Sequence, residues 1–531
     1  MKHLITKKLF IILFVVLSLF VLAFINNRSA IGDEFGTIWI ASQHDPGFII
    51  SKVQQTDIHP PTYYLILHYW GKLLDYSDTT MRLLSWVLIM FSAFLIFKIM
   101  PFFLKEENRK YKAEILCLTL SSPAIWYMAL YARYYAFGLC ISLLSFYFYF
   151  QWNKIGNRRD YFLWIIFTVA LFYIHYFISF TVLACQVLYN MFNKKGSSKD
   201  LIKTTLIPII LILLLSTPVL WWSLKPLLIN QSSSFYVTKS VFLPETLSAW
   251  KGLPLFLAGN ILSMLGGAIV FPWTFWITLP LVLIVIYFLF FDLRYRRILL
   301  KKDFLILVVI PFLLLICLMA FYLPITGYFL GIYRLPHITV FFLVFIFTTV
   351  FVTDNKYRKV GFFILIFVNL YSISVLTLNL SSNIQTPPLN EMGGFISKRV
   401  DREQSTVVIN PFEHGWGQAI LRYLPNQMEA ILVKDNNEYL SSDSCISILS
   451  NKHFVNVWII RPNRFPQSSE KIKFWLTEND YASKDSISFQ SQSSINLFFK
   501  EQLKNIKSLG FSNHPSAKYI YTVFLFQKRE N

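Results

Sequence analysis

The sequence has few charged residues and no cysteine pattern that points to a metal or a disulfide framework. Charged side chains make up 15% of its 531 residues and hydrophobic ones 55%, a ratio that excludes an ordinary soluble domain. The five cysteines show no paired spacing, so neither a disulfide scaffold nor a zinc site follows from them. No internal repeat or low-complexity tract is evident. The composition therefore predicts a membrane protein.

Long apolar runs rich in aromatic residues recur along the first 380 residues, and many could cross about 30 Å of hydrocarbon. The net charge of +20 would suggest a nucleic-acid partner in a soluble protein. Here the basic residues cluster in short loops between apolar runs, as the positive-inside rule describes, so no nucleic acid is implied. The five basic loops are 105–112, 153–160, 193–203, 292–303 and 354–359.

Placing these loops and the basic N-terminus in the cytoplasm predicts eleven transmembrane helices in the cell membrane, with the C-terminus outside. We interpret the first helix as a retained signal anchor rather than a cleaved signal peptide. Two outer turns are expected near 130–135 and 173–177. The stretch 253–271 resembles a span, but counting it would invert every later basic loop, so we interpret it as an outer-face or re-entrant helix. The later spans are expected at 204–222, 273–291, 304–323, 334–353 and 360–380.

The predicted fold is thus a polytopic α-helical membrane domain over 1–380, with its first outer loop at 27–81. From 381 to 531 the pattern changes to short apolar runs that alternate with helix-compatible segments. This alternation predicts a small extracytoplasmic α/β domain. The expected strands are "STVVIN", "EAILVK", "FVNVWII" and "YTVFLFQ".

The predicted topology gathers chemically capable side chains on the outer face, where charges at the ends of membrane helices are solvated, paired or functional. Each also has a structural interpretation. Asp33 and Glu34 would be solvated acids after the first span, and "HPP" would be a rigid turn. Arg133 and Arg334 would be interfacial cations, and His175 would belong to an aromatic belt. The candidate residues are Asp33, Glu34, Asp57, His59, Arg133, Tyr134, His175, Tyr176 and Arg334.

The order of the motifs favours a function. An acid pair in "GDEF" precedes "DIHPPTYYLILHYW", and "ARYYAFGL", "HYF" and "YRLP" follow. This order resembles the GT-C class of glycosyltransferases that use lipid-linked sugars. The likeness is strongest to its protein O-mannosyltransferase and aminoarabinose transferase branch, including bacterial dolichyl-phosphate-mannose-protein mannosyltransferase-like members. It covers roughly 1–380. Such members often carry a lysine soon after "HPP", and its absence here weakens the case for a protein serine or threonine acceptor.

The resemblance implies a role for each candidate. Asp33 would be the general base, and Glu34 would orient the base or the acceptor. Arg133 would hold the lipid phosphate, while Asp57 and His59 would shape the loop and the sugar pocket. The remaining substrate-binding candidates are Tyr134, His175, Tyr176 and Arg334.

These residue types suit the chemistry of a polyprenyl-phosphate sugar donor. A carboxylate must accept the proton of the attacking hydroxyl, and arginine suits the departing phosphate. A donor delivered within the bilayer needs no glycine-rich nucleotide loop, and no convincing one is found. No cofactor is predicted; Asp33 and Glu34 would be the ligands if a divalent metal assists, but no ligand set is visible. The predicted reaction inverts the anomeric centre and glycosylates an acceptor hydroxyl on a glycan, a lipid or a protein.

Two other functions remain open. A transporter or flippase for a lipid-linked sugar would favour repeats and charges near the bilayer midplane. A polysaccharide polymerase or ligase would use a similar donor, but its large outer loop is expected late in the chain. A membrane anchor for the C-terminal domain would not need eleven spans. Within the transferase hypothesis, we expect the C-terminal domain to guide the acceptor.

Overall fold

The computed structural model describes most of the N-terminal half and most of the C-terminal domain of the chain. It covers residues 2–193 apart from 27–28, 31, 58, 105 and 107–111; residues 202–229; scattered positions between 366 and 377; and 389–400, 405–409, 420–425, 428–433, 441–452, 454–462, 467–490 and 520–529. The chain divides into two units. One contains residues 1–25 and 37–378, and the other contains residues 26–36 and 379–531.

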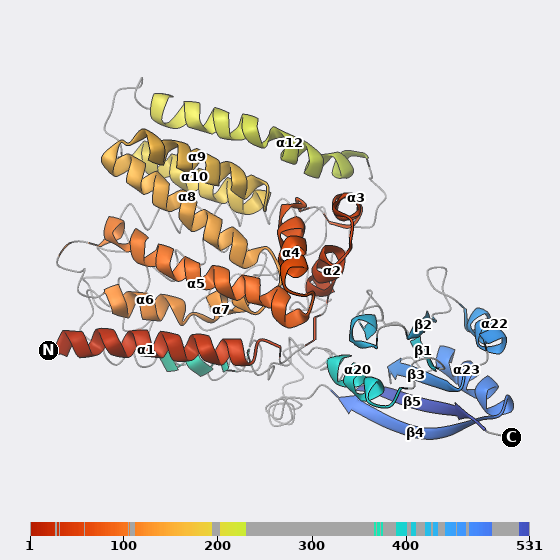
Figure 1. Cartoon of the computed structure of the whole chain (residues 1–531). Coiled ribbons are helices and arrows are strands. Elements are labelled where there is room, and N and C mark those ends of the chain that lie inside the picture. The colour runs from red at the N-terminus through yellow and green to blue at the C-terminus, as the bar shows by residue number, and fades with distance from the viewer. Residues whose placement is uncertain are drawn as a thin grey trace, which may run out of the picture. The chain divides into compact units, whose positions relative to one another are not determined.

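The described part of the first unit is helical (Figure 1). Capping side chains mark where several of its helices begin. Asp45 caps the third helix by accepting hydrogen bonds from the amides of Gly47 and Phe48, and Ser77 caps the fifth. The elements are α1 (Lys2–Ala23), α2 (Gly32–Ala41), α3 (Pro46–Thr56), α4 (Thr62–Leu73), α5 (Asp78–Phe103), α6 (Lys112–Leu120), α7 (Pro123–Ala129), α8 (Tyr135–Ile155), α9 (Arg158–Phe172), α10 (Tyr176–Asn193), the π-helical turn η2 (Ile202–Leu206) and α12 (Ile207–Ile229).

Two described stretches, Asp78–Phe102 and Thr204–Trp222, are long and apolar enough to cross a membrane, by length and composition. The prediction of eleven spans is therefore not confirmed. The segments 253–271, 273–291, 304–323 and 334–353 lie outside the described residues.

The stretch between the basic loop 105–112 and the expected turn near 130–135 is not one continuous helix. It divides into α6 and α7 at Ser121 and Ser122, where the following Pro123 begins the second helix. Proline fits the first turn of a helix because its missing N–H would have no intrahelical partner there. The break therefore follows from the local sequence.

Buried polar side chains connect α8, α9 and α10. The Gln186 amide nitrogen donates to the Ser145 hydroxyl at 2.8 Å, and Trp164 Nε1 donates to the Gln186 Oε1 at 2.8 Å. The hydroxyls of Ser145 and Thr168 are also 2.8 Å apart. Such bonds join helices in surroundings where apolar packing alone gives little specificity. They fix the register of three helices whose adjoining turns, 130–134 and 173–175, carry candidate site residues.

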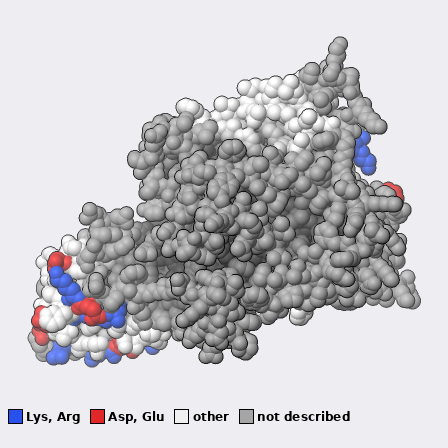
Figure 2. Space-filling view, turned by 180° about the vertical axis from the view of Figure 1, so that it is seen from behind, with Lys and Arg blue, Asp and Glu red and all other residues white. Residues whose placement is uncertain are grey.

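The described part of the second unit is built on a mixed five-stranded sheet with the order β2-β1-β3-β5-β4. β1 pairs in parallel with β2 and β3, whereas β5 is antiparallel to β3 and β4. Figure 2 shows charged side chains of both signs interspersed on the described surface of this unit, as on a water-exposed domain. Its elements are α20 (Leu389–Ser397), β1 (Ser405–Ile409), the 3-10 turn η7 (Ile420–Tyr423), β2 (Glu429–Leu432), α22 (Ser442–Lys452), β3 (Asn456–Pro462), α23 (Gln467–Glu478), β4 (Tyr481–Gln490) and β5 (Ile520–Lys528).

The sheet has an apolar core on each face because successive strand residues point to opposite sides. On one face, Val407 and Trp458 pack with residues of α20 and η7. On the other, Val408 and Ile459 pack with residues of α22 and α23. The strand pattern of the sequence thus yields a sheet covered by helices on both sides.

Replacing two glycines that lie within helices by alanine should change the stability in opposite directions. A Cβ at Gly71 would lie 2.5 Å from the Tyr76 ring and 2.7 Å from Met81 Cε, whereas a Cβ at Gly36 would meet nothing within 4 Å. We expect Gly71→Ala to lower the free energy of unfolding by about 1–3 kcal/mol through overpacking. Gly36→Ala should raise it by about 0.5–1 kcal/mol, because alanine favours a helix. Thermal unfolding in nanodiscs would measure both, and equal changes would contradict this packing.

Candidate functional site

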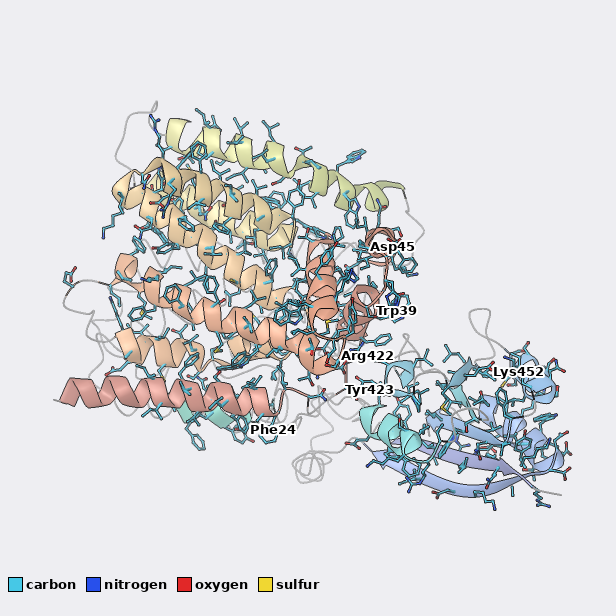
Figure 3. The ribbon with its side chains drawn as sticks, viewed as in Figure 1. Phe24, Trp39, Asp45, Arg422, Tyr423 and Lys452 are labelled. Carbon is cyan, nitrogen blue, oxygen red and sulfur yellow. The ribbon has the colours of Figure 1, made fainter. Side chains whose placement is uncertain are left out.

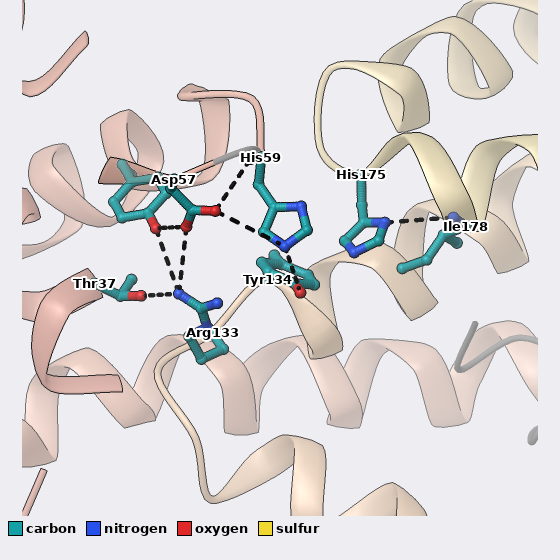
Figure 4. Close-up of polar contacts among 8 residues, drawn as sticks. Thr37, Asp57, His59, Arg133, Tyr134, His175 and Ile178 are labelled. Carbon is teal, nitrogen blue, oxygen red and sulfur yellow. Dashed lines mark hydrogen bonds and ion pairs between the residues drawn. The ribbon is translucent and has the colours of Figure 1, made fainter. Parts of the chain in front are cut away.

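The candidate site of the helical unit centres on Arg133, which lies in the turn between α7 and α8 (Figure 4). Its Nη1 donates to the Thr37 hydroxyl at 2.5 Å and to the Tyr64 hydroxyl at 3.4 Å. The same nitrogen is 3.8 Å from Asp57 Oδ2. Side chains from α2, the end of α3 and α4 therefore converge on the guanidinium group of Arg133, a residue that is only 5% exposed.

Tyr64 connects the arginine to the carboxylate. Its hydroxyl accepts from Arg133 and donates to Asp57 Oδ2 in a short hydrogen bond. Burial, followed by the negative charge of Asp57, raises the pKa of the Tyr64 hydroxyl well above its usual value. The hydroxyl therefore stays protonated at physiological pH and keeps donating to Asp57.

The "DIHPP" turn places Asp57 at this site. Asp57 ends α3, where its N–H donates to the Val53 carbonyl at 2.8 Å. Its Oδ1 accepts from the His59 amide at 3.1 Å, which closes a local side-chain turn. Pro61 follows and precedes α4, whose first turn carries Tyr64. The two prolines restrict the backbone between the carboxylate and the tyrosine that binds it.

A cluster of aromatic rings adjoins the Asp57 carboxylate. His59 Nε2 is 3.1 Å from the Tyr134 hydroxyl and 3.9 Å from Asp57 Oδ1. The His59 ring stacks on the His175 ring, with a centroid distance of 4.5 Å. Tyr176 stacks on His175 at 5.7 Å. These contacts join the turn between α9 and α10 to the turns that carry Asp57 and Arg133.

Arg133 places a buried positive charge in the site. A buried guanidinium carries a large desolvation cost unless it is paired and hydrogen-bonded. Asp57 supplies the opposite charge, but at 3.8 Å the pair is looser than a bidentate arginine–carboxylate pair. Arg133 also lies 5.0 Å from the Tyr134 ring centroid. A phosphate would bind this cation through shorter, charge-assisted hydrogen bonds.

The structure brings most of the predicted site residues of this unit together. Asp57, His59, Arg133, Tyr134, His175 and Tyr176 form one continuous set of contacts. Asp33 and Glu34 are in the first turn of α2, in the segment that belongs to the other unit. The Asp33 side chain is exposed, whereas Glu34 is buried. Arg334 lies outside the described residues.

Sequence reasoning missed two residues of the site, Thr37 and Tyr64. Tyr64 follows Asp57 by seven residues in the "HPPTYYL" segment, so the proline turn could have indicated it. Thr37 lies one helical turn after Asp33, on the same face of α2. A lone threonine within an apolar helix carries no signal that separates it from a core residue.

Within the described ranges, no three His, Cys, Asp or Glu side chains gather in a way that would hold a metal ion. The role of a divalent metal therefore stays a hypothesis.

The described residues form a helical unit and a unit built on a five-stranded sheet. No family model and no curated protein sequence matches the chain. It is similar to the crystal structure of ArnT from Cupriavidus metallidurans in the apo state, with a TM-score of 0.53 and 11% identity over 97% of both chains. This likeness shows a shared fold.

Two further structures are less similar. ArnT from the same organism bound to undecaprenyl phosphate gives a TM-score of 0.47 and 12% identity, over 97% of both chains. An oligosaccharyltransferase of Archaeoglobus fulgidus, in complex with zinc and sulfate, gives a TM-score of 0.36 and 11% identity. The match covers 90% of this chain and 71% of that chain.

Proposed function

We propose that this protein is an integral-membrane glycosyltransferase that moves a sugar from a polyprenyl-phosphate donor to an acceptor hydroxyl. The reaction takes place on the outer face of the cell membrane and inverts the anomeric centre. The single observation that carries this proposal is the Arg133 site, because a buried cation held by Thr37, Tyr64 and Asp57 in a GT-C fold suits a lipid phosphate. In the order of its motifs, the chain resembles the mannosyltransferase-like branch of the GT-C class.

The proposed reaction needs one base and one cation. The acceptor oxygen attacks the anomeric carbon, and its proton passes to the Asp33 carboxylate. The bond between the anomeric carbon and the phosphate oxygen breaks, and its electron pair stays with the departing polyprenyl phosphate. Arg133 stabilises the charge that builds on that phosphate. Asp57 neutralises Arg133 when no donor is bound.

Within the acid pair, exposure favours Asp33 as the base. Its side chain is exposed, so an acceptor hydroxyl has access to the carboxylate. Glu34 is buried at 1% exposure, which suits a residue that orients its surroundings. Both acids lie in the first turn of α2. The aromatic cluster of His59, Tyr134 and His175 would form part of the sugar pocket.

Tyr64→Phe tests whether the hydroxyl that joins Arg133 and Asp57 matters for the donor. We expect donor affinity to fall by about 3–10-fold, because the arginine loses one oriented hydrogen bond. Tyr149→Phe is the matched control: its buried hydroxyl donates to the Gln186 carbonyl and to Asn190 Oδ1, away from the site. Binding of polyprenyl phosphate in nanodiscs would measure both variants. Equal affinities for the two would contradict the role of Tyr64.

Mass spectrometry of envelope glycans and lipids tests the proposed function in cells. A strain without the protein should lack one sugar on one acceptor and should accumulate a polyprenyl-phosphate sugar. The missing sugar and its carrier would identify the donor and the acceptor together. Unchanged glycans and lipids would contradict the proposal.

A further inference from the structure

The segment before α2 is held by the C-terminal domain. The Ala30 amide donates a hydrogen bond to the Tyr423 hydroxyl at 2.7 Å, across 393 positions of sequence. Ser29 and Ala30 are both buried. Five residues later, Phe35 packs against the core cluster that α20 forms with the sheet, which includes Leu389. Residues 26–36 accordingly belong to the same unit as 379–531.

These two contacts flank the acid pair. Ala30 lies three residues before Asp33, and Phe35 lies one residue after Glu34. We infer that Tyr423, together with the Phe35 packing, is a positioning residue that fixes the start of α2 and thereby the Asp33 carboxylate. The inference rests on the proposed function, in which Asp33 is the base. It gives the C-terminal domain a part in turnover, beyond the acceptor guidance that the sequence suggested.

The position of Tyr423, labelled in Figure 3, is itself fixed by a close backbone approach. Gly393 lies in α20, and a Cβ at this residue would overlap the carbonyl oxygen and the Cβ of Tyr423. A Cβ at the neighbouring Gly394 would meet nothing within 4 Å. Only glycine at 393 lets α20 approach η7 this closely, so a methyl group there must displace Tyr423. The chain thus offers two ways to disturb the same contact.

The experiment compares two disturbing variants with two matched controls in the full-length protein in nanodiscs. Tyr423→Phe removes only the hydroxyl, and Gly393→Ala displaces the whole residue. Tyr481→Phe removes a buried hydroxyl that donates to the Phe454 carbonyl on the other face of the sheet, and Gly394→Ala adds a methyl group in open space. Hydrogen exchange of the peptide spanning 26–36 and single-turnover transfer are measured for all four.

We expect faster exchange at 26–36 in Tyr423→Phe and Gly393→Ala, and kcat about tenfold lower with donor Kd unchanged. A displacement of about 1 Å in a reacting group can cost about 10²-fold, so a tenfold loss is a modest estimate. The controls should change neither quantity. In an Asp33→Asn background, Tyr423→Phe should lower kcat no further, because both changes act through the same carboxylate.

The outcomes separate this inference from the proposed function. Unchanged exchange in Tyr423→Phe, or faster exchange with a normal kcat, would overturn the positioning role while leaving the transferase proposal intact. If Tyr423→Phe lowers kcat by the same factor in the wild-type and the Asp33→Asn backgrounds, Tyr423 affects turnover independently of Asp33. That outcome would also overturn the positioning role. Normal turnover in Asp33→Asn alone would instead overturn the base assignment, and the positioning inference with it. The exchange measurement needs no enzymatic activity.

Discussion

Replacing Asp33 by asparagine is expected to lower kcat by about 10²-fold or more and to leave donor affinity nearly unchanged. Asparagine keeps the size of the side chain but cannot accept the proton of the acceptor hydroxyl. The lost interaction belongs to the transition state, so it lowers turnover and not ground-state binding. Single-turnover transfer and donor binding in nanodiscs measure the two quantities, with thermal unfolding as a check on folding.

Asp45→Asn provides the matched control for this change. Asp45 is an exposed acid in the same predicted outer loop, 27–81, and it caps α3 through its side chain. Asparagine caps a helix about as well as aspartate, so stability and turnover should both be kept. Glu34→Gln should have an intermediate effect. Near-normal turnover in Asp33→Asn would rule out Asp33 as the base.

Removing the guanidinium of Arg133 should weaken donor binding as well as turnover. Arg133→Ala takes away charge-assisted hydrogen bonds to phosphate, and we expect donor affinity to fall by about 10–100-fold. Turnover should fall by about 10²–10³-fold, because the same cation stabilises the departing phosphate. Arg133→Lys should recover only part of the donor affinity and of the turnover, because an ammonium group cannot form the bidentate hydrogen bonds of a guanidinium. Binding of polyprenyl phosphate and single-turnover transfer would measure these changes.

Lys72→Ala serves as the control for a lost positive charge. Lys72 is exposed near the end of α4, the helix that also carries Tyr64. Its removal should leave donor affinity unchanged. Equal loss of donor binding in Asp33→Asn and Arg133→Ala would contradict the separate roles and would favour a shared structural function for both residues.

Short apolar runs were enough to predict four strands of the C-terminal sheet but not the fifth. The runs "STVVIN" and "YTVFLFQ" correspond to β1 and β5. The missed strand is β4, with the sequence "YASKDSISFQ". It is an edge strand with a register shift between Ser483 and Asp485, and most of its residues are exposed. Its pairing is set by β5, so its own sequence carries little apolar pattern.

The turns that carry the candidate site were predictable from the sequence, but the contacts within the site were not. Basic loops and apolar runs placed the turns at 130–135 and 173–177, and the structure has turns at 130–134 and 173–175. Motif order then indicated Arg133 and Asp57. That Tyr64 joins these two side chains depends on tertiary packing, which no local pattern encodes. The grouping of residues 26–36 with the C-terminal domain likewise depends on a contact between residues almost 400 positions apart.

The most direct test of the transferase proposal uses envelope membranes from cells that lack the protein. Such membranes should contain both the accumulated donor and the unmodified acceptor, so neither has to be known in advance. Adding purified protein in nanodiscs should produce free polyprenyl phosphate and glycosylated acceptor in equal amounts, detected together by mass spectrometry. Asp33→Asn protein should produce neither at a comparable rate. Loss of the donor without a glycosylated product, or no change in the donor and the acceptor, would contradict the proposal.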